Sequence, residues 1–423
     1  MSRGLLPILL AVLLSLPGVI LELLALFGGV HAADWLAAIL FGGTIVGGAF
    51  LLSWAAEVLQ LDVSAGLALA ILALIAILPE YVVGATFAWD APGNPDNAEL
   101  AIANMTGANR LLIGLFWPLI VGIVWYRQRT RVTQLNRENG LEIMALLAAT
   151  IYAFVIPFKG SLTWIDLVIL VTIFGVYLSQ LSKLPSGEPH LVGPSKIIGT
   201  YPKAQRRAIV AVLGAVSAGF ILLVAHPFGE ALVASGQQFG IDEFLLVQWV
   251  APIASEAPEL VIVTLFAWRG ATTEAFGALV SSKINQWTLL IAMLPLIYAV
   301  SAGGLEPMNF PTAAGDGLFT FAGQEIFITA AQSLFAVVLL LDLRLGLPGA
   351  GLLLVLFFVQ LSFPDLGMEV GITYLVLALI GIIWSRRHIV PLFTGVRDFL
   401  AKAEADKKLA EAQAKKPVAG PAD

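Results

Sequence analysis

Two proline–glutamate pairs lie inside stretches of the chain that are too apolar to be anything but membrane-spanning. Pro79-Glu80 lies in AILALIAILPEYVVGATFAW, and Pro258-Glu259 lies in LLVQWVAPIASEAPELVIVTLFAW. A carboxylate at membrane depth costs roughly 2.5–3.5 kcal/mol on insertion scales, so it is a functional-site candidate by default. The neighbouring proline removes a helix hydrogen bond and frees a carbonyl oxygen four residues earlier. Two such segments at matching places in one chain indicate an internal repeat around an ion site in the middle of the membrane.

The composition indicates an integral membrane protein. Of the 423 residues, 59% are hydrophobic and 12% are charged, and the mean hydropathy is +0.90; soluble domains carry about 25% charged residues. The apolar runs approach or exceed the ~20 residues that span a bilayer as helix, and they lack the alternation of an outer-membrane barrel. The absence of cysteine excludes disulfides, thiolate metal sites and thiol nucleophiles. The first run holds Glu22 and has no signal-peptidase site after it, so we expect an uncleaved span.

We therefore predict an all-α polytopic membrane protein with about 12 transmembrane helices. The expected helices occupy residues of about 5–28, 35–60, 64–89, 98–125, 141–157, 163–182, 207–240, 243–268, 272–300, 318–341, 347–363 and 368–385. The seventh contains Pro227 and is expected to be kinked there.

Basic residues are distributed unequally between the two sets of connections, which predicts the orientation. With the N-terminus inside, the inside connections hold most of the basic residues: Arg127, Arg129, Arg131, Arg137, Lys183, Lys196, Lys203, Arg206, Arg207, Arg269, Arg344, Arg386 and Arg387. The outside connections hold a single basic residue, Lys159, and eight acidic ones: Asp34, Asp90, Asp96, Asp242, Glu306, Asp316, Asp365 and Glu369. We expect a prokaryotic cytoplasmic (inner) membrane protein with both termini in the cytoplasm.

Helices two to six and seven to eleven form two units of five. Because five is odd, the second unit enters from the opposite side, which gives a core of two inverted five-helix repeats with flanking first and last helices. The predicted divisions are an extra N-terminal transmembrane helix at 1–34, a first inverted repeat at 35–182, a cytoplasmic linker at 183–206, a second inverted repeat at 207–364, an extra C-terminal transmembrane helix at 365–388 and a cytoplasmic tail at 389–423.

Oxygen-bearing side chains gather at and after the proline–glutamate pairs. Glu256 and Glu259 are three residues apart, so they share one helix face and can address one cavity together with Glu80. The helices that follow contribute neutral oxygens: Asn104, Asn109 and Ser282. Carboxylates combined with neutral oxygens suit a hard cation such as Ca²⁺, Na⁺ or H⁺. A structural role stays open for the neutral side chains, because asparagine and serine also serve as packing groups between membrane helices.

Other acids and the histidines carry weaker signals. Snorkelling or pairing is expected of the acids near helix ends: Glu22, Glu57, Glu99, Glu243 and Glu325. The four histidines are scattered over loops and helix ends, which argues against a histidine metal cluster. A Gly-rich phosphate loop, a local serine-nucleophile signature and an H-E-x-x-H helix are all absent from the sequence.

The chain resembles the cation/Ca²⁺ exchanger superfamily, that is, the sodium/calcium exchanger membrane region of α-repeat antiporters, as a divergent member. The family's repeats read roughly G-T-S-x-P-E, followed by G-N-x-x-G-S-N. The second repeat here reads Ala254-Ser255-Glu256-Ala257-Pro258-Glu259 and then Gly277-Ala278-Leu279-Val280-Ser281-Ser282-Lys283. The first reads Ile77-Leu78-Pro79-Glu80 and then Ala103-Asn104-Met105-Thr106-Gly107-Ala108-Asn109. The resemblance covers about 35–363 and implies that Glu80 and Glu259 are the metal ligands, with Ser255 among the residues of the cation site.

The chain departs from the family pattern at positions that would touch the ion. Lys283 replaces an expected asparagine, and Arg110 interrupts the first repeat, so both are predicted to modulate the charge of the site. A lysine at this depth must pair or lose its proton, and Glu256 and Glu259 are the expected partners. With Glu80 the cavity then has a net charge of -2, matching one Ca²⁺ or two protons. Lys283→Asn should leave -3, tighten Ca²⁺ binding, change the coupling ratio and destabilise the ion-free protein.

We predict a secondary antiporter that exchanges Ca²⁺ for Na⁺ or H⁺ by alternating access, with no catalytic residues and no cofactor besides the transported ions. The expected partners are the lipid bilayer and inorganic cations, and no nucleic acid. Alternatives are a Na⁺/H⁺ antiporter, for which fewer acids suffice, and, in a different class, an ion channel or an intramembrane enzyme. An enzyme would need a nucleophile with a base or a metal–histidine site, and a channel usually obtains its pore from oligomer symmetry.

Overall fold

The computed structural model describes residues 6–62, 78–136, 139–182, 191–312, 318–387 and 394–395. The helices before the middle of the chain are α1 (Leu6–Gly28), α2 (Asp34–Leu59), α4 (Leu78–Asp90), α5 (Asp96–Leu111), the π-helix η2 (Leu112–Phe116), α6 (Trp117–Gln128), α7 (Asn139–Ala153), α8 (Val155–Lys159) and α9 (Trp164–Leu181). Those after it are α10 (Pro194–Gly199), α11 (Lys203–Phe239), α12 (Glu243–Arg269), α13 (Thr272–Asn285), the π-helix η3 (Gln286–Leu290), α14 (Ile291–Ala302), α15 (Phe321–Leu339), α16 (Leu347–Ser362) and the 3-10 turn η4 (Pro364–Leu366). A further apolar helix covers Pro364–Arg387.

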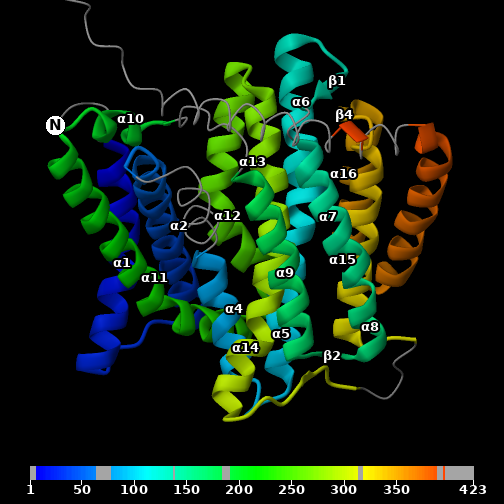
Figure 1. Cartoon of the computed structure of the whole chain (residues 1–423). Helices are drawn as coiled ribbons and strands as arrows, with labels where there is room; N and C mark the ends of the chain where they lie inside the picture. The colour runs from blue at the N-terminus through cyan, green and yellow to red at the C-terminus, as the bar shows by residue number, and fades with distance from the viewer. Residues whose placement is uncertain are drawn as a thin grey trace, which may run out of the picture.

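The helical membrane protein expected from the sequence is what the structure shows (Figure 1). Among the described residues, nine helices are long and apolar enough to cross a membrane, or ten if the bent α12 is counted as one span; α16 is a shorter apolar helix. The third expected helix, at about 64–89, is described only from Leu78 onward. The count of twelve therefore stays a prediction. The expected linker at 183–206 is described from residue 191, and the expected tail lies almost wholly outside the described residues.

The same run of three helical elements occurs at matching places in the two halves of the chain. In each half a helix rich in small residues runs into a five-residue π-helix and continues as a second α-helix: α5–η2–α6 in one half and α13–η3–α14 in the other. Two short strand pairs connect the halves, β1 (Val132–Gln134) with β4 (Arg344–Gly346) and β2 (Ser161–Leu162) with β3 (Met308–Asn309), both antiparallel. The β1–β4 pair lies at one end of the bundle and the β2–β3 pair at the other (Figure 1).

Helices α1, α2 and α11 pack together along one side of the bundle (Figure 1). The α1–α2 contact is close because Gly47 has no side chain: a Cβ there would lie 2.4 Å from the carbonyl oxygen of Ala11. Thr44 Oγ1 donates to the Ser15 carbonyl at 2.7 Å across the same contact. Small residues and hydroxyl groups are the usual means by which membrane helices associate. The first helix is thus tightly packed against the second.

Most of the buried core surrounds α5, which packs against α4, α12 and α15. Almost every residue of α5 from Ala98 to Leu111 is buried, although the helix is rich in polar and small residues. Its closest neighbour is α12: a Cβ on Gly107 would lie 1.8 Å from the Gln248 carbonyl oxygen. Only glycine allows the two backbones to approach this closely. This contact brings the polar residues of α5 next to the glutamates of α12.

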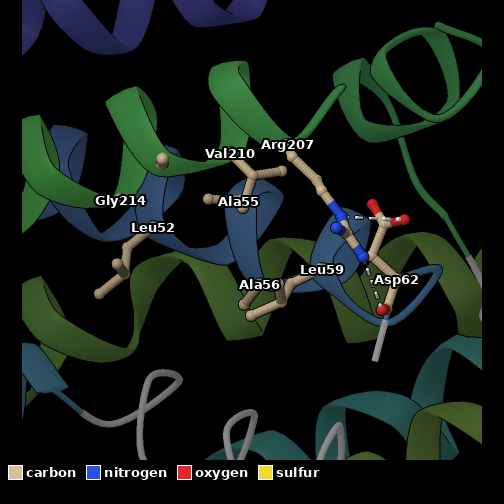
Figure 2. A pocket seen from close by; sticks show the side chains of 9 residues that line it. Leu52, Ala55, Ala56, Leu59, Asp62, Arg207, Val210 and Gly214 are labelled. Atoms are coloured by element: carbon tan, nitrogen blue, oxygen red, sulfur yellow. Dashed lines mark hydrogen bonds and ion pairs between the residues drawn. The ribbon is translucent and has the colours of Figure 1, made fainter. Parts of the chain in front are cut away.

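A cavity of about 440 Å³ lies between α2 and α11, apart from the core. Its walls are aliphatic, and at its edge Arg207 reaches toward Asp62 (Figure 2). Arg206 also holds Asp62, donating from Nη2 to Oδ1 at 2.7 Å and from Nε to Oδ2 at 2.9 Å. This two-pronged hydrogen bond lowers the pKa of the Asp62 carboxyl below its ordinary value of 3.8. The ion pair therefore connects the end of α2 with the start of α11.

Asp62→Asn is expected to lower the melting temperature at neutral pH and to lower it less below pH 3.8. Because the folded-state pKa of Asp62 is lowered, its contribution to stability is complete above the ordinary pKa of 3.8 and is lost as the pH falls through the lowered value. Melting curves of the purified protein in detergent, between pH 7 and about pH 3, would measure the difference. A gap between wild type and variant that is as large at the acid end would contradict this assignment.

Candidate cation site

Three carboxyl groups meet where α4 and α12 face each other. Glu80 lies in the first turn of α4, beside Pro79, and it is 1% exposed. Glu256 and Glu259 lie on α12, which bends by 58° between Ala257 and Glu259. Glu256 is within hydrogen-bonding reach of both other carboxyls. Two ionised carboxylates only accept, so each such hydrogen bond requires a proton on one of the partners. The three groups therefore form a row with Glu256 in the middle.

Neutral side chains from η3 and α13 donate to the two glutamates of α12. Gln286 Nε2 donates to Glu256 Oε1, and Ser282 Oγ donates to Glu259 Oε2 at 2.8 Å. These donors stabilise carboxylates that would otherwise be buried without partners. The structure thus places Ser282 beside Glu259, and its predicted role as a neutral cation ligand stays a prediction. The role of Gln286 as a donor to Glu256 was not predicted.

Several buried polar atoms beside the row receive no hydrogen bond from the described residues. Both oxygens of Glu80 receive no hydrogen bond from a donor group, and neither Oδ1 nor Nδ2 of Asn104 has a partner. The Asn104 amide lies against Gly84, one turn after Glu80 on α4. Buried polar atoms are normally paired, and unpaired ones point to a ligand, an ion or a mechanistic role. Glu80 and Asn104 thus provide free oxygens on one side of the row.

The donor set suits a hard cation, although the described side chains do not form a cage. No group of three histidine, cysteine, aspartate or glutamate side chains in the described part of the chain is arranged to hold a metal ion. Ca²⁺ prefers six to eight oxygen ligands, combining carboxylates with neutral oxygens and water. Glu80, Glu259 and Asn104 offer oxygens of both kinds. The assignment of Glu80 and Glu259 as metal ligands stays a prediction.

Lys283 does not make the contact expected from the sequence. Its amine donates to Asn109 Oδ1 at 2.7 Å and to the Asn109 carbonyl oxygen at 3.3 Å, and it lies 4.5 Å from the centre of the Trp287 ring. No carboxylate of the described residues lies within ion-pair distance of the amine, so the expected ion pair with Glu256 or Glu259 is wrong. Gln286 holds Glu256 instead, and α13 directs Lys283 toward α5. Glu80 is the carboxyl whose charge acts on the amine.

Asn109 and Ser255, two other predicted ligands, form hydrogen bonds with groups outside the carboxyl row. Asn109 accepts from Lys283 and donates from Nδ2 to the Met105 carbonyl at 2.8 Å. Ser255 Oγ donates to the carbonyl oxygens of Ala251 and Pro252, at 3.3 and 3.2 Å, in its own helix. Serine hydroxyls in membrane helices commonly bond the preceding turn in this way. The structure therefore brings Asn109 to the lysine and leaves Ser255 bonded within α12.

Arg110 forms a separate polar cluster beside the site. It pairs with Glu325 of α15, its guanidinium carbon lies 5.2 Å from the Trp249 ring, and Gln248 Nε2 donates to the same Glu325 oxygen at 2.5 Å. The expectation that Glu325 is paired is confirmed.

Glu57 is paired as well, accepting from the Val192 amide at 2.8 Å. Gln248 was not predicted; its place in the apolar run LLVQWV was the available signal.

The fold and the carboxyl row define an integral membrane protein that gathers acidic groups at the bend of α12, and comparison with known proteins places it in a family. The family model described as "Sodium/calcium exchanger protein" matches residues 33–182 and 209–364. The solved structure of the H⁺/Ca²⁺ exchanger CAX is 36% identical and superposes with a TM-score of 0.87, over 95% of this chain and 99% of that one. No curated protein matches the chain.

Two more distant structures share the fold. Native YfkE is 15% identical with a TM-score of 0.60, over 86% of this chain and 99% of that one. The sodium-calcium exchanger NCX_Mj is 19% identical with a TM-score of 0.52, over 78% of this chain and 98% of that one. The chain belongs to the sodium/calcium exchanger protein family. The resemblance read from the two proline–glutamate repeats is thereby confirmed.

Proposed function

We propose that this protein exchanges Ca²⁺ for protons at the row formed by Glu80, Glu256 and Glu259. The observation that carries the proposal is the row itself: carboxyls that share protons in the absence of metal are carboxylates that Ca²⁺ can bind once those protons leave. The chain is similar to an H⁺/Ca²⁺ exchanger over nearly its whole length. The protons and the Ca²⁺ would therefore compete for the same oxygens, which is the requirement for exchange.

The charge of the site agrees with this exchange. Fully ionised, the row carries three negative charges, and Lys283 lies close enough for Glu80 to act on it. Arg110 and Glu325 neutralise each other. Three carboxylates and one ammonium leave a net charge of -2, which one Ca²⁺ or two protons would balance. We therefore infer that one Ca²⁺ exchanges for two protons.

We also propose that the two halves are inverted repeats that alternate access to the site. The paired π-helices support a repeat, because the same rare element follows the same small-residue helix in each half. The strand pairs support an inversion: β1 and β4, and likewise β2 and β3, join non-equivalent connections of the two halves at opposite ends of the bundle (Figure 1). Transport by alternating access in such folds is rigid-body motion of one unit against another around a fixed site.

The proposed setting is the cytoplasmic membrane of a prokaryote, with both termini inside. Arg131, which precedes β1, and Arg344, the first residue of β4, lie with those strands at one end of the bundle, and the N-terminal end of α1 lies at that end too (Figure 1). Connections rich in arginine and lysine face the cytoplasm.

Flux in proteoliposomes tests the proposed exchange. Vesicles loaded with Ca²⁺ and with buffer at one pH are diluted into buffer of a lower pH, without Na⁺, and Ca²⁺ release is followed with an external dye. We expect release that depends on the pH gradient and saturates with Ca²⁺. Ca²⁺ release that needs an inward Na⁺ gradient and does not respond to the pH gradient would mean that the counter-ion is Na⁺ and not H⁺. No release under either gradient would overturn Ca²⁺ exchange, and Na⁺ flux against a pH gradient would favour a Na⁺/H⁺ antiporter.

A further inference from the structure

The Lys283 amine is surrounded by oxygens and an aromatic ring, groups that attract a cation. The side chain is completely buried, with 0% of its surface exposed. Two oxygens of Asn109 and the face of the Trp287 ring contact the amine. Backbone carbonyl and amide oxygens are the neutral ligands with which transporters coordinate Na⁺, and aromatic faces attract cations. The site lies between α5 and α13, at the point where each helix enters its π-helix.

The direct contacts of the amine are those that an ammonium group makes. Both oxygens accept hydrogen bonds, the ring presents its electron-rich face, and none of the described residues donates a hydrogen bond to the amine. A neutral amine has a lone pair that would need a donor, whereas an ammonium group needs only acceptors. Arg110 is close enough to repel the amine, but that guanidinium is paired with Glu325. The contacts therefore match those of one positive charge placed beside Asn109 and Trp287.

Asn109 and Lys283 are counterparts in the two halves. Asn109 lies three residues before η2 begins at Leu112, and Lys283 lies three residues before η3 begins at Gln286. With asparagine at both positions, two amide oxygens and one backbone carbonyl would face each other across the gap that the amine now fills. A small monovalent cation fits such a ring of neutral oxygens. The lysine replaces one of these ligands and supplies the charge itself.

We propose that the Lys283 ammonium is a tethered substitute for a monovalent metal cation, and that it makes this exchanger independent of Na⁺. Removing the amine would open a Na⁺ site that includes both Asn109 oxygens. The consequence for coupling rests on the proposed Ca²⁺/H⁺ exchange, whereas the site itself is accessible to a binding measurement. In the wild-type protein no Na⁺ would bind there, because the ammonium fills the space and would repel a second cation.

The test compares monovalent-cation binding by the wild type and by variants of Lys283. Lys283→Ala opens the space, Lys283→Asn restores the second amide, and Lys283→Met keeps the volume of the side chain without its charge. Melting temperatures are measured in detergent in choline, lithium, sodium or potassium chloride at constant ionic strength. We expect a rise of a few degrees in Na⁺ for the alanine and asparagine variants and no cation dependence for the wild type and the methionine variant.

Two further measurements make the outcome decisive. Equilibrium binding of radioactive Na⁺ should appear in Lys283→Ala and Lys283→Asn and be absent from the wild type. Proton-driven Ca²⁺ flux should become Na⁺-dependent in the same two variants, at least tenfold between choline and Na⁺ buffers. The inference is overturned if the wild type binds Na⁺ as tightly as the variants do. It is also overturned if both variants keep a Ca²⁺-dependent rise in melting temperature, which shows that they fold, yet bind no monovalent cation.

A failure of the proposed Ca²⁺/H⁺ exchange can be distinguished from a failure of the proposed role of Lys283. If the wild type transports no Ca²⁺ while Lys283→Ala gains Na⁺ binding, the exchange proposal fails and the tethered-cation site stands. If the wild type exchanges Ca²⁺ for protons while no variant binds Na⁺, the exchange stands and the amine has only a structural role. Lys283→Arg is the matched control, since it keeps the charge and should remain insensitive to Na⁺.

Discussion

Glu80→Gln is expected to abolish Ca²⁺ exchange while the protein remains folded. Glutamine has nearly the same shape but no charge, so the site would fall from a net charge of -2 to -1 in the ionised state. The attraction between two unit charges about 4 Å apart is about 4 kcal/mol at an effective dielectric constant of 20. Losing it lowers the affinity for Ca²⁺ by roughly a thousandfold. The fold should tolerate the change, because no donor of the described residues bonds the Glu80 oxygens. Ca²⁺ flux and Ca²⁺-dependent melting would both report the loss.

Glu274→Gln is the matched control for this variant. Glu274 lies in the first turn of α13, on the exposed side of a helix that also carries Ser282 and Lys283. The same chemical change at that position should leave flux within about twofold of the wild type, since exposed charges contribute little. If Glu80→Gln retained flux at the level of Glu274→Gln, the row of carboxyls would not be the Ca²⁺ site.

The convergence of the acids could be predicted from the sequence because burial makes charge expensive. Glu80 and Glu259 each lie beside a proline in an apolar run, and the only other charged residue in either run is Glu256. A carboxylate in such a run is expected to face an internal site. The three-residue spacing of Glu256 and Glu259 places them on one face of a helix whatever its neighbours are. These inferences depend on local sequence and on membrane depth. They needed no knowledge of how the helices rotate against each other.

The partner of Lys283 could not be predicted, because it depends on that rotation. The motif places the lysine one residue after Ser282, at the depth of the glutamates, and on charge alone a glutamate was the natural partner. Adjacent helical positions point about 100° apart, so Ser282 faces Glu259 while Lys283 faces α5. The π-helices were also invisible in the sequence. A π-helix contains an extra residue in a turn and shifts every side chain that follows, including Trp287.

The paired strands and the buried arginine show a second limit of sequence reasoning. Strands β2 and β3 are two residues each, too short for an alternating pattern, and their pairing depends on which connections meet in space. That Arg110 modulates the charge of the site stays a prediction, and its pairing with Glu325, which lies 215 positions along the chain, was not predicted. Sequence patterns identify a buried charge. They do not identify which distant residue neutralises it.

Breaking the pair of Arg110 and Glu325 is expected to cause the largest loss of stability among single substitutions. Glu325→Ala would leave the guanidinium without a carboxylate, and Arg110 is completely buried, with 0% of its surface exposed. Removing one partner of a buried ion pair costs about 3–5 kcal/mol, because an uncompensated charge remains in a dry interior. Gln248 would also lose its acceptor on Glu325. Thermal melting and chemical unfolding in detergent would measure the loss.

Removing both charges together separates the ion pair from simple packing. In Arg110→Met with Glu325→Gln no charge is left uncompensated, and glutamine can still accept from Gln248, so most of the lost stability should return. Lys159→Met is the matched control: Lys159 is paired with Asp166 but partly exposed, and Asp166 keeps hydrogen bonds from Tyr152 and Thr163. Its effect should be smaller than that of Glu325→Ala, because these hydrogen bonds still stabilise the Asp166 carboxylate. A double variant as unstable as Glu325→Ala would mean that α5 and α15 depend on the shape of these side chains, and that the charge of Arg110 is compensated elsewhere.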